Sequence, residues 1–446
     1  KMMEIVSPTV SVTTGQTTTI SVKIKNFGLY TLDSTRIHYV VNGVENVYNW
    51  SGSLAFNTLS PTINVGNFVP ISGVNTITVF TTHPNGVQDE NTSNDTLSLV
   101  AFGCDSLLNG VYTVGGATAD YPDEEAVMLA LLNCGINGPV EFRFASGNYG
   151  SLNFNKAITG SSSTNTITFT SQAGYAASVS FVDSVNAALT LYNASNLYFR
   201  NVTLNGIIGN YGVLFMGNCN NIEFYGCNIM ADPTTTSSTK AAIYRNGSSG
   251  SSDMLSNIRL IKNNISGGYY NVYWYYGGGS TSYMGQNCII DSNNFTDAYY
   301  GGLWLYFANT NFNSISYNKM TCRSIGPYYY FYGFYIYYYN NIDSVVGNKI
   351  DVRNTSVSYT YPFQVRYYNN YTNNPYGRML IANNEIITQV SSYSYGGIYI
   401  YEYSNCDVIN NSIYSGASST AYGLYLYTSS TSYPIIAKNN NVYTTT

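Results

Sequence analysis

In the repetitive C-terminal part of this chain, the side chains that could catalyse a reaction are carboxylates, and these are few and scattered. Calcium-assisted elimination needs clustered carboxylates beside a strong base, and cleavage of a glycosidic bond needs two facing acids. From residue 200 onward the acids are Glu223, Asp232, Asp253, Asp291, Asp297, Asp343, Asp351, Glu385, Glu402 and Asp407. Asp291 and Asp297 come nearest to a pair, and we expect Asp297 in a loop. We therefore predict no catalytic residues.

Other reactive residue types also form no recognisable site. Neither histidine, His38 nor His83, has the neighbours of a nucleophile or metal-ligand pattern. The sequence contains no phosphate-binding loop, zinc-ligand spacing or catalytic triad, so we expect no metal and no cofactor. A net charge of −5, with 9% charged residues and no basic stripe, argues against nucleic acid as a partner. No apolar run is long enough for membrane insertion.

Seven cysteines are too few for a scaffold held together by disulfides. Cys104 and Cys134 flank a short helical segment and could pair. Cys219 and Cys227 lie close in the sequence and are a second possible bridge. We interpret others, such as Cys288, as small core residues.

Tyrosine is unusually abundant, with 47 residues in the chain. Segments that begin with a glycine, such as 397–401 (Gly-Ile-Tyr-Ile-Tyr), then alternate aliphatic and aromatic residues, so the rings should face away from an aliphatic core. The rings fall into two aligned rows: Tyr244, Tyr273, Trp304, Tyr335, Tyr399 and Tyr425 in the first, and Tyr275, Tyr306, Tyr337, Tyr401 and Tyr427 in the second. One repeat unit carries Gln364 and Arg366 instead and should interrupt both rows.

Two roles stay open for this aromatic surface. Rings stacked ~4.8 Å apart would form ladders worth about 0.5–1.5 kcal/mol per neighbouring pair, so stabilisation alone would explain them. Flat amphipathic rings that carry a hydroxyl also suit a sugar face or a protein interface. The rows are therefore both a candidate ladder and the candidate surface for a ligand or partner.

A repeat of about 30 residues, running from about residue 196 to 446, would position these rings. Its anchors are the apolar residues Val202, Ile229, Ile265, Phe295, Met320, Ile350, Ile386, Ile413 and Val442. Seven of the nine residues two positions before an anchor are Asn, and apolar residues alternate at the strand period. Gaps of 25 to 36 residues predict stacked β-coils with loops of varying length. The Asn side chains should turn the chain and bond to one another along the axis.

The N-terminal part has a different pattern. Residues 1–102 show strand segments at 18–25, 36–41, 75–81 and 96–100, with a hairpin signal at Asn42-Gly43, as in a β-sandwich. Residues 103–137 form a junction with one helix at 126–133, which we expect to cap the first coil because an open solenoid end exposes edge and core. Residues 138–446 form the solenoid, which we expect to be truncated at its C-terminus.

Two stretches resemble known families. Residues 25–28 (Lys-Asn-Phe-Gly), 41–43 (Val-Asn-Gly) and 91–95 (Asn-Thr-Ser-Asn-Asp) resemble CARDB-type immunoglobulin-like modules of bacterial surface proteins. Residues 110–116 (Gly-Val-Tyr-Thr-Val-Gly-Gly) and 166–169 (Thr-Ile-Thr-Phe) resemble the start of the right-handed parallel β-helix in large secreted surface proteins of Bacteroidetes. The first resemblance implies a spacer or adhesion module. The second implies export by the type IX secretion machinery and display at, or release from, the cell surface.

The second resemblance also implies a modification. Asp followed by Ser or Thr, and then by an aliphatic residue or Thr, is similar to the O-glycosylation pattern of these bacteria. Sugars are accordingly expected, where the side chains are exposed, on Ser34, Thr96, Ser106, Ser184 and Ser344.

The sequence thus predicts an all-β chain with an immunoglobulin-like β-sandwich, a short capping helix and a right-handed parallel β-helix. We expect a non-enzymatic extracellular protein, an adhesin or a surface-fibre component, with surface glycans or other surface proteins as partners. Parallel β-helices include pectate lyases and polygalacturonases, so a polysaccharide lyase or glycoside hydrolase is the alternative. A groove holding three or more acids with an Arg or Lys would favour the enzyme, and a flat aromatic sheet would favour adhesion or assembly.

Overall fold

The computed structural model describes residues 1–89, 95–247, 253–275, 285–324, 329–338, 340–366, 377–402, 404–429 and 434–445. Strands make up 61% of the chain and helix 4%, so the all-β prediction is confirmed. The chain divides into two compact units. The first comprises Lys1–Asn109 and Ala126–Asn137, and the second comprises Gly110–Glu125 and Gly138–Thr446.

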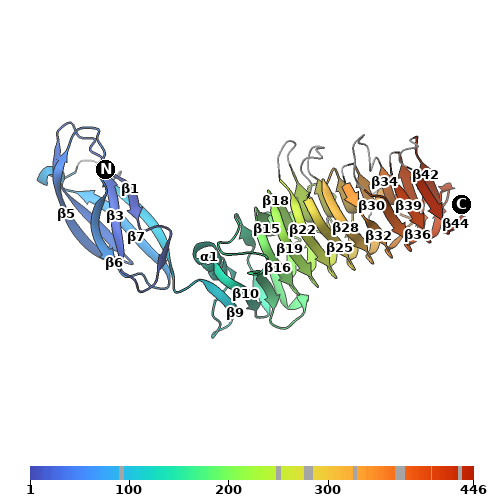
Figure 1. Ribbon diagram of the computed structural model, residues 1–446, viewed down its shortest axis with the longest axis horizontal. Coiled ribbons are helices and arrows are strands. Elements are labelled where there is room, and N and C mark those ends of the chain that lie inside the picture. The colour runs from blue at the N-terminus through green and yellow to red at the C-terminus, as the bar shows by residue number, and fades with distance from the viewer. Residues whose placement is uncertain are drawn as a thin grey trace. The chain divides into compact units, whose positions relative to one another are not determined.

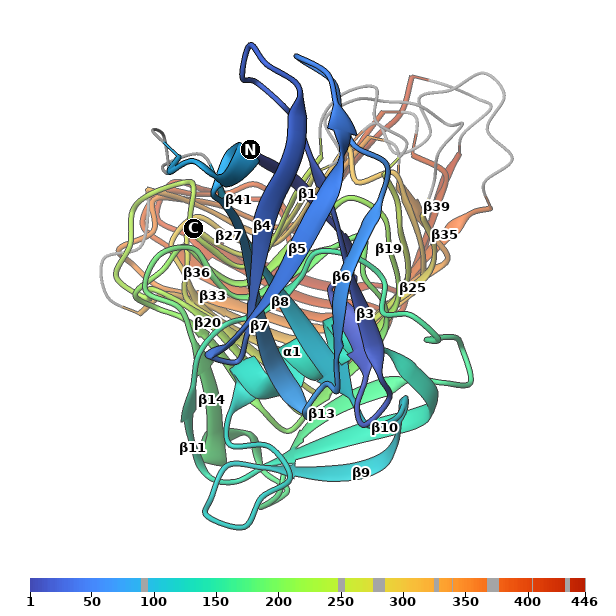
Figure 2. The same cartoon turned by 90° about the vertical axis from the view of Figure 1, so that its left-hand side faces the viewer.

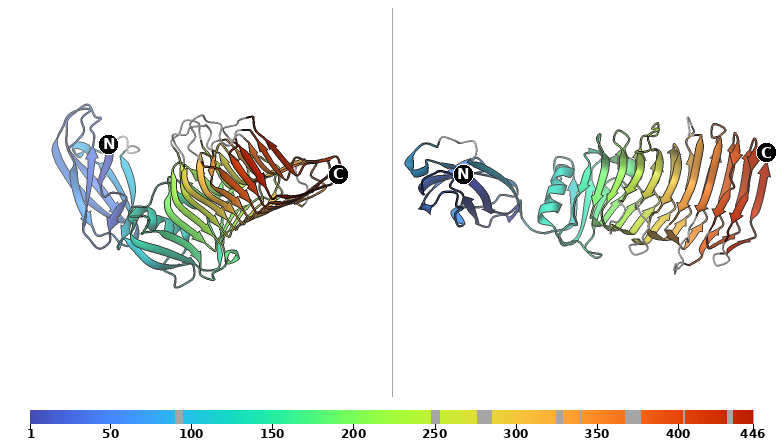
Figure 3. Two further views of the ribbon diagram at one scale, coloured as in Figure 1. Left: turned by 45° about the vertical axis from the view of Figure 1, so that its right-hand side comes forward. Right: turned by 90° about the horizontal axis from the view of Figure 1, so that it is seen from above.

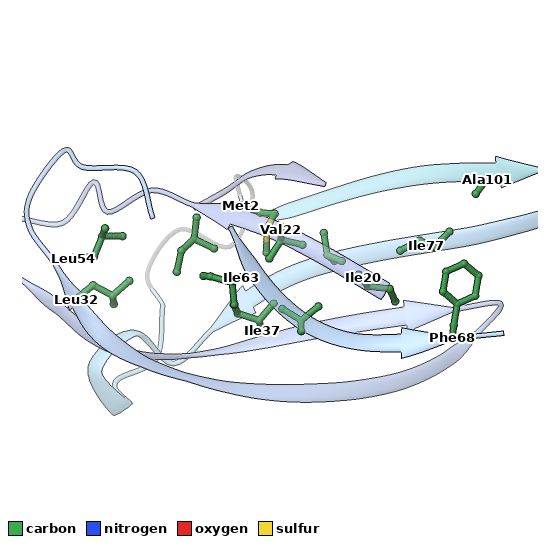
Figure 4. Packing of buried hydrophobic residues seen from close by; sticks show 13 residues of the cluster. Met2, Ile20, Val22, Leu32, Ile37, Leu54, Ile63, Phe68, Ile77 and Ala101 are labelled. Atoms are coloured by element: carbon green, nitrogen blue, oxygen red, sulfur yellow. The ribbon is translucent and has the colours of Figure 1, made fainter. Parts of the chain in front are cut away.

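The first unit contains two antiparallel-rich sheets around one core. The three-stranded sheet has the order β1 (Met2–Ser7), β3 (Thr18–Ile24), β6 (Ile63–Phe68). The five-stranded sheet has the order β2 (Ser11–Thr13), β8 (Thr96–Cys104), β7 (Gly73–Thr82), β4 (Leu32–Val41), β5 (Val44–Leu54). Ile20 and Ile63 of the smaller sheet and Ile37 and Ile77 of the larger one belong to the same buried cluster (Figure 4). The two sheets therefore share one hydrophobic core.

The hairpin predicted at Asn42-Gly43 is confirmed. Val41 pairs with Val44 across the turn, and Asn42 and Gly43 have φ angles of 48° and 85°, which Asn and Gly adopt more readily than other residues. Of the motif at 91–95, residues 91–94 lie outside the described residues. The single α-helix among the described residues, α1 (Glu124–Cys134), begins with Glu124 and Glu125 in its first turn, where acidic side chains favour the positive helix end. Whether α1 caps the solenoid stays a prediction.

The second unit is a β-solenoid of about ten turns with roughly 29 residues per coil. Strands of successive coils pair in parallel within three sheets, so the strands lie side by side along the stack (Figure 1). Figure 3 shows the same stacking from two further directions. In a view along the stack, β20, β33 and β36 lie on one side and β25, β35 and β39 on the other (Figure 2).

The first sheet has nine strands and a four-stranded continuation. The nine are β9 (Leu108–Val114), β10 (Ile136–Phe144), β13 (Ile167–Ser171), β16 (Ser195–Arg200), β19 (Cys219–Tyr225), β22 (Leu255–Ile261), β25 (Gly285–Asp291), β28 (Thr310–Ser316) and β31 (Asn340–Ile342). The four are β32 (Ser344–Val346), β35 (Met379–Ala382), β39 (Cys406–Ile409) and β43 (Ile435–Lys438).

The second sheet has eleven strands. They are β11 (Gly147–Tyr149), β14 (Val179–Val182), β17 (Thr203–Gly206), β20 (Asn228–Ala231), β23 (Asn264–Ser266), β26 (Asn294–Ala298), β29 (Lys319–Cys322), β33 (Lys349–Arg353), β36 (Glu385–Val390), β40 (Ser412–Ala417) and β44 (Asn441–Thr445).

The third sheet has twelve strands and carries the aromatic residues. They are β12 (Leu152–Phe154), β15 (Ala187–Tyr192), β18 (Tyr211–Met216), β21 (Ala241–Asn246), β24 (Tyr270–Tyr275), β27 (Gly301–Tyr306), β30 (Tyr330–Tyr337), β34 (Tyr359–Arg366), β37 (Tyr393–Ser394), β38 (Ile398–Tyr401), β41 (Thr420–Ala421) and β42 (Leu424–Tyr427).

The predicted anchors pair in register along the second sheet from Ile229 to Val442. The first anchor is wrong by two residues, because Leu204, and not Val202, pairs with Ile229. Val202 and Leu204 are both apolar and fully buried, so the hydrophobic pattern could not distinguish them.

Asparagines two residues before the anchors form the predicted column inside the coils, here called the asparagine ladder. Its members are Asn263, Asn293, Asn318, Asn348, Asn384, Asn411 and Asn440. Asn318 is typical: its Nδ2 donates to Asn348 Oδ1 at 3.0 Å and to the Ile290 carbonyl at 2.8 Å. Its own Oδ1 accepts from the backbone N and the Nδ2 of Asn293 at 2.9 and 3.0 Å. The ladder thereby satisfies buried polar groups at the bend of each coil.

Candidate functional site

Outward side chains of the third sheet form an aromatic surface, here called the tyrosine face. Its first row is Tyr244, Tyr273, Trp304, Tyr335, Gln364, Tyr399 and Tyr425, and its second row is Tyr275, Tyr306, Tyr337, Arg366, Tyr401 and Tyr427. Consecutive members of each row are paired residues of neighbouring strands. The rows that the sequence predicts therefore follow the strand register of the third sheet.

Glycines let the third sheet lie close to the second. A Cβ atom at Gly397 would overlap the side chain of Ile413, and one at Gly423 would overlap Val442. Both glycines come directly before an aliphatic–aromatic strand, so they place the aliphatic residues in the core while the rings stay outside.

Three pairs of neighbouring rings in the first row lie nearly parallel: Tyr244 with Tyr273, Trp304 with Tyr335, and Tyr399 with Tyr425. The centroids of Trp304 and Tyr335 are 4.0 Å apart with ring planes 21° apart, and those of Tyr399 and Tyr425 are 4.5 Å apart at 6°. Gln364 interrupts this row, as predicted. Its side chain is buried and its Oε1 has no hydrogen-bond partner in the described part of the chain.

The second row is continuous, contrary to the prediction. The Arg366 guanidinium lies 5.7 Å from the Tyr337 ring centroid and 5.3 Å from that of Tyr401. On one side Tyr306 stacks on Tyr337 at 5.0 Å, and on the other Tyr401 stacks on Tyr427 at 5.1 Å. A guanidinium is planar and stacks on aromatic faces, so Arg366 takes the place of a ring.

Two further rows were missed from the sequence. One contains Tyr300, Tyr332, Tyr361 and Tyr395, and the other contains Tyr330, Tyr359 and Tyr393. The rings of Tyr361 and Tyr395 are 4.5 Å apart and within 4° of parallel. Tyrosines spaced two apart, as at Tyr393 and Tyr395, were the available signal, because residues two apart share one face of a strand.

The rings are only partly accessible, and burial raises the pKa of some of their hydroxyls. Exposure ranges from 8% at Tyr335 to 42% at Tyr427. Burial raises the pKa of Tyr273, Tyr332 and Tyr335, and neighbouring tyrosines raise those of Tyr273 and Tyr332 further. Parallel neighbours cover the ring faces, so the surface presents mainly ring edges and hydroxyls.

The carboxylates do not assemble into a common site. Asp291 lies on the first sheet, where its Oδ1 accepts from Ser314 Oγ and the Ser316 backbone N at 2.8 Å. Asp297 was expected in a loop but lies in β26 of the second sheet. Most other acids bind a nearby cation, as Glu385 binds Lys349 at 2.9 Å. Among the described residues no three His, Cys, Asp or Glu side chains group as metal ligands.

Cys104 and Cys134 form a disulfide that joins the end of β8 to the end of α1. Cys219 and Cys227, the second possible bridge, are both free and buried. Cys227 instead occupies the start of the asparagine ladder, where its backbone N donates to Asn263 Oδ1 at 2.9 Å.

The expected glycosylation residues differ in accessibility. Thr96, Ser106 and Ser184 are exposed. Ser34 and Ser344 are half-buried in strands, and Ser344 Oγ donates to the Asn313 carbonyl at 3.2 Å. The first three are therefore the better acceptors.

No helix within the described ranges is long and apolar enough to cross a membrane. No family model matches the chain, and no curated protein matches it. Among solved structures, the chain is similar to the CARDB domain of the PF1109 protein from Pyrococcus furiosus, which was crystallised in complex with di-metal ions. The two are 23% identical, and the match covers 21% of this chain and 84% of that domain with a TM-score of 0.18. A similarity of this size assigns no activity to the chain.

Proposed function

We propose that this chain is a non-enzymatic, exported cell-surface protein, an adhesin or a structural component of a surface fibre. The observation that carries the proposal is the tyrosine face, in which stacked rings run along the third sheet from coil to coil. Such a surface stabilises a long rod and offers a regular array of hydroxyls and ring edges. Tyrosine hydroxyls at this spacing suit hydrogen bonding to a glycan or to the surface of another protein.

The other parts of the chain fit this role. The two sheets of the first unit suit an immunoglobulin-like sandwich that acts as a spacer, and α1 suits a cap on a right-handed β-helix. Export through the type IX machinery and O-glycosylation at Thr96, Ser106 and Ser184 complete the proposal. The carboxylates described above, many of which are bound to a cation or to hydroxyl and backbone donors, support it against a polysaccharide lyase or hydrolase.

The test replaces two stacked rings near one end of the first row, as Tyr399→Ser with Tyr425→Ser, in the full chain. Loss of the stacking contact should remove at least about 0.5–1.5 kcal/mol and lower the Tm by at least about 1–2 °C. If the face also binds, capture of glycans on an array, or of surface proteins in a pull-down, should fall. Tyr192→Ser is the matched control, because Tyr192 is an exposed tyrosine of the same sheet outside these rows.

The readouts separate the two roles of the face. A lower Tm with unchanged capture would show that the tyrosine face only stabilises the solenoid and would contradict the binding role. An unchanged Tm would contradict the stabilising role of the stacked rings.

A further inference from the structure

A second surface feature lies on the first sheet and not on the third sheet, which carries the tyrosine face. It is a groove of about 610 Å³, here called the asparagine groove. Its walls are largely amide side chains, from Asn196, Asn220, Asn221, Asn257, Asn287 and Asn313. These residues belong to five successive coils, from β16 to β28, so the groove runs along the solenoid axis.

The groove has a local cause in the backbone. Asn196, Asn221, Asn257 and Asn287 have φ angles of 62°, 56°, 55° and 57°, the left-handed region that Asn adopts more readily than other non-glycine residues. Each therefore bends its strand at a corresponding position. Four stacked bends make a concave strip.

The amides in the strip are linked but keep hydrogen-bonding capacity. Asn221 Nδ2 donates to Asn196 Oδ1 at 2.9 Å, and Asn257 Nδ2 donates to Asn220 Oδ1 at 2.7 Å. Asn287 Nδ2 donates to Asn257 Oδ1 at 3.3 Å. A carboxamide has two N–H donors and two lone pairs, so each link leaves capacity for a hydroxylated ligand.

The groove also has a positive wall. Arg259 lines it, and the Arg259 Nε lies 3.5 Å from Glu223 Oε2. The same carboxylate binds Arg200, whose Nε and Nη2 lie 3.0 and 2.7 Å from Glu223 Oε1. Glu223 is 6% exposed, whereas the side chains of Arg200 and Arg259 are about half exposed. Two guanidiniums around one buried carboxylate give a local charge of +1 at the surface of a chain whose net charge is −5. None of the described residues that line the groove carries a carboxylate.

We propose that the asparagine groove binds an extended acidic polysaccharide, with the sugar chain lying along the solenoid axis. The amides would bind sugar hydroxyls, and Arg259 would bind a carboxylate or sulfate group. Ile289, which also lines the groove, would contact the apolar face of a sugar ring. Coils repeat every ~4.8 Å, close to the length of one sugar unit, so successive coils can meet successive sugars. This site is independent of the tyrosine face.

Isothermal titration of the full chain tests the site with matched ligands: a polyuronate oligosaccharide, its carboxyl-reduced neutral form, a sulfated dextran and unmodified dextran. We expect the polyuronate or the sulfated dextran to bind and both neutral ligands to bind at least about tenfold more weakly. The acidic ligand that binds more tightly identifies whether the groove prefers a carboxylate or a sulfate group.

Arg259→Gln should weaken binding of the acidic ligand by about tenfold or more, and Asn257→Ala should weaken it to a smaller extent. Arg353→Gln is the control, because Arg353 is an exposed arginine of the second sheet paired with Asp351. Equal binding of acidic and neutral ligands, no binding at all, or equal losses in Arg259→Gln and Arg353→Gln would overturn the site. Tyr399→Ser with Tyr425→Ser should leave this binding unchanged, which separates it from the proposed role of the tyrosine face.

Discussion

Arg366 shows how one side chain can serve a position that the sequence pattern assigns to another type. An arginine in a row of tyrosines suggests an interruption, because a charged side chain is far more hydrophilic than an aromatic ring. Its guanidinium is nevertheless flat and lies between Tyr337 and Tyr401. Shape and charge distribution, not hydropathy, decide whether the row continues.

Arg366→Ser should therefore destabilise the solenoid, whereas Arg366→Tyr should preserve most of its stability. Two cation–π contacts at partly exposed sites are worth about 0.5–1 kcal/mol each, so the serine variant should lose about 1–2 kcal/mol. Chemical unfolding followed by circular dichroism measures the difference. A serine variant as stable as the parent chain would show that the stacked guanidinium contributes nothing measurable to stability.

At the scale of the elements, the bend between the first and second sheets depends on the asparagine ladder. Asn318→Ala removes an amide from the middle of the buried column and leaves the backbone N of Asn293 without its acceptor. Unsatisfied buried groups cost about 1–3 kcal/mol each, so we expect a loss of about 2–4 kcal/mol. Thermal unfolding and local hydrogen exchange would show it.

Asn440→Ala is the matched control for this change. Asn440 makes the same type of bond to the Val408 carbonyl, at 2.9 Å, but is half-buried in the last described coil, where water can replace the amide. Its loss should be clearly smaller. Equal losses at the two positions would mean that burial does not set the strength of the ladder.

The same elements show what the sequence could and could not predict. The anchors and the asparagine ladder were predictable because each coil repeats an apolar residue at a fixed offset from an Asn. The hairpin signal marked only the start of strand β5; its length to Leu54 was missed, since most of its residues are exposed and no alternation marks it. The asparagine groove was also missed: its Asn residues look like ordinary turn formers until the register of neighbouring strands brings them together.

At the scale of the whole molecule, burial raises the pKa of many tyrosines in the same direction. An unfolded tyrosine ionises near pH 10, whereas burial raises the pKa of Tyr211 to about 12 and also raises those of Tyr270 and Tyr361. Above pH 10 the unfolded chain binds fewer protons than the folded one, so stability falls as pH rises. The contribution is complete below pH 10 and is lost as pH rises through the folded pKa values.

We therefore expect the solenoid to unfold cooperatively in alkali above about pH 10. Tyrosinate absorbance and far-ultraviolet circular dichroism should change in the same pH interval. The chain in concentrated guanidinium chloride should instead titrate with a midpoint near pH 10. Complete ionisation by about pH 11 with an intact dichroism spectrum would contradict the expectation.

The asparagine ladder also has a direction. From Asn263 to Asn440, all six side-chain bonds run from the amide N–H of one coil to the amide oxygen of the next. The amide dipoles therefore add along the axis instead of cancelling, and each bond polarises the next. The interior of this weakly charged rod thus holds an electrically polar column, with its negative end at Asn263 and its positive end at Asn440.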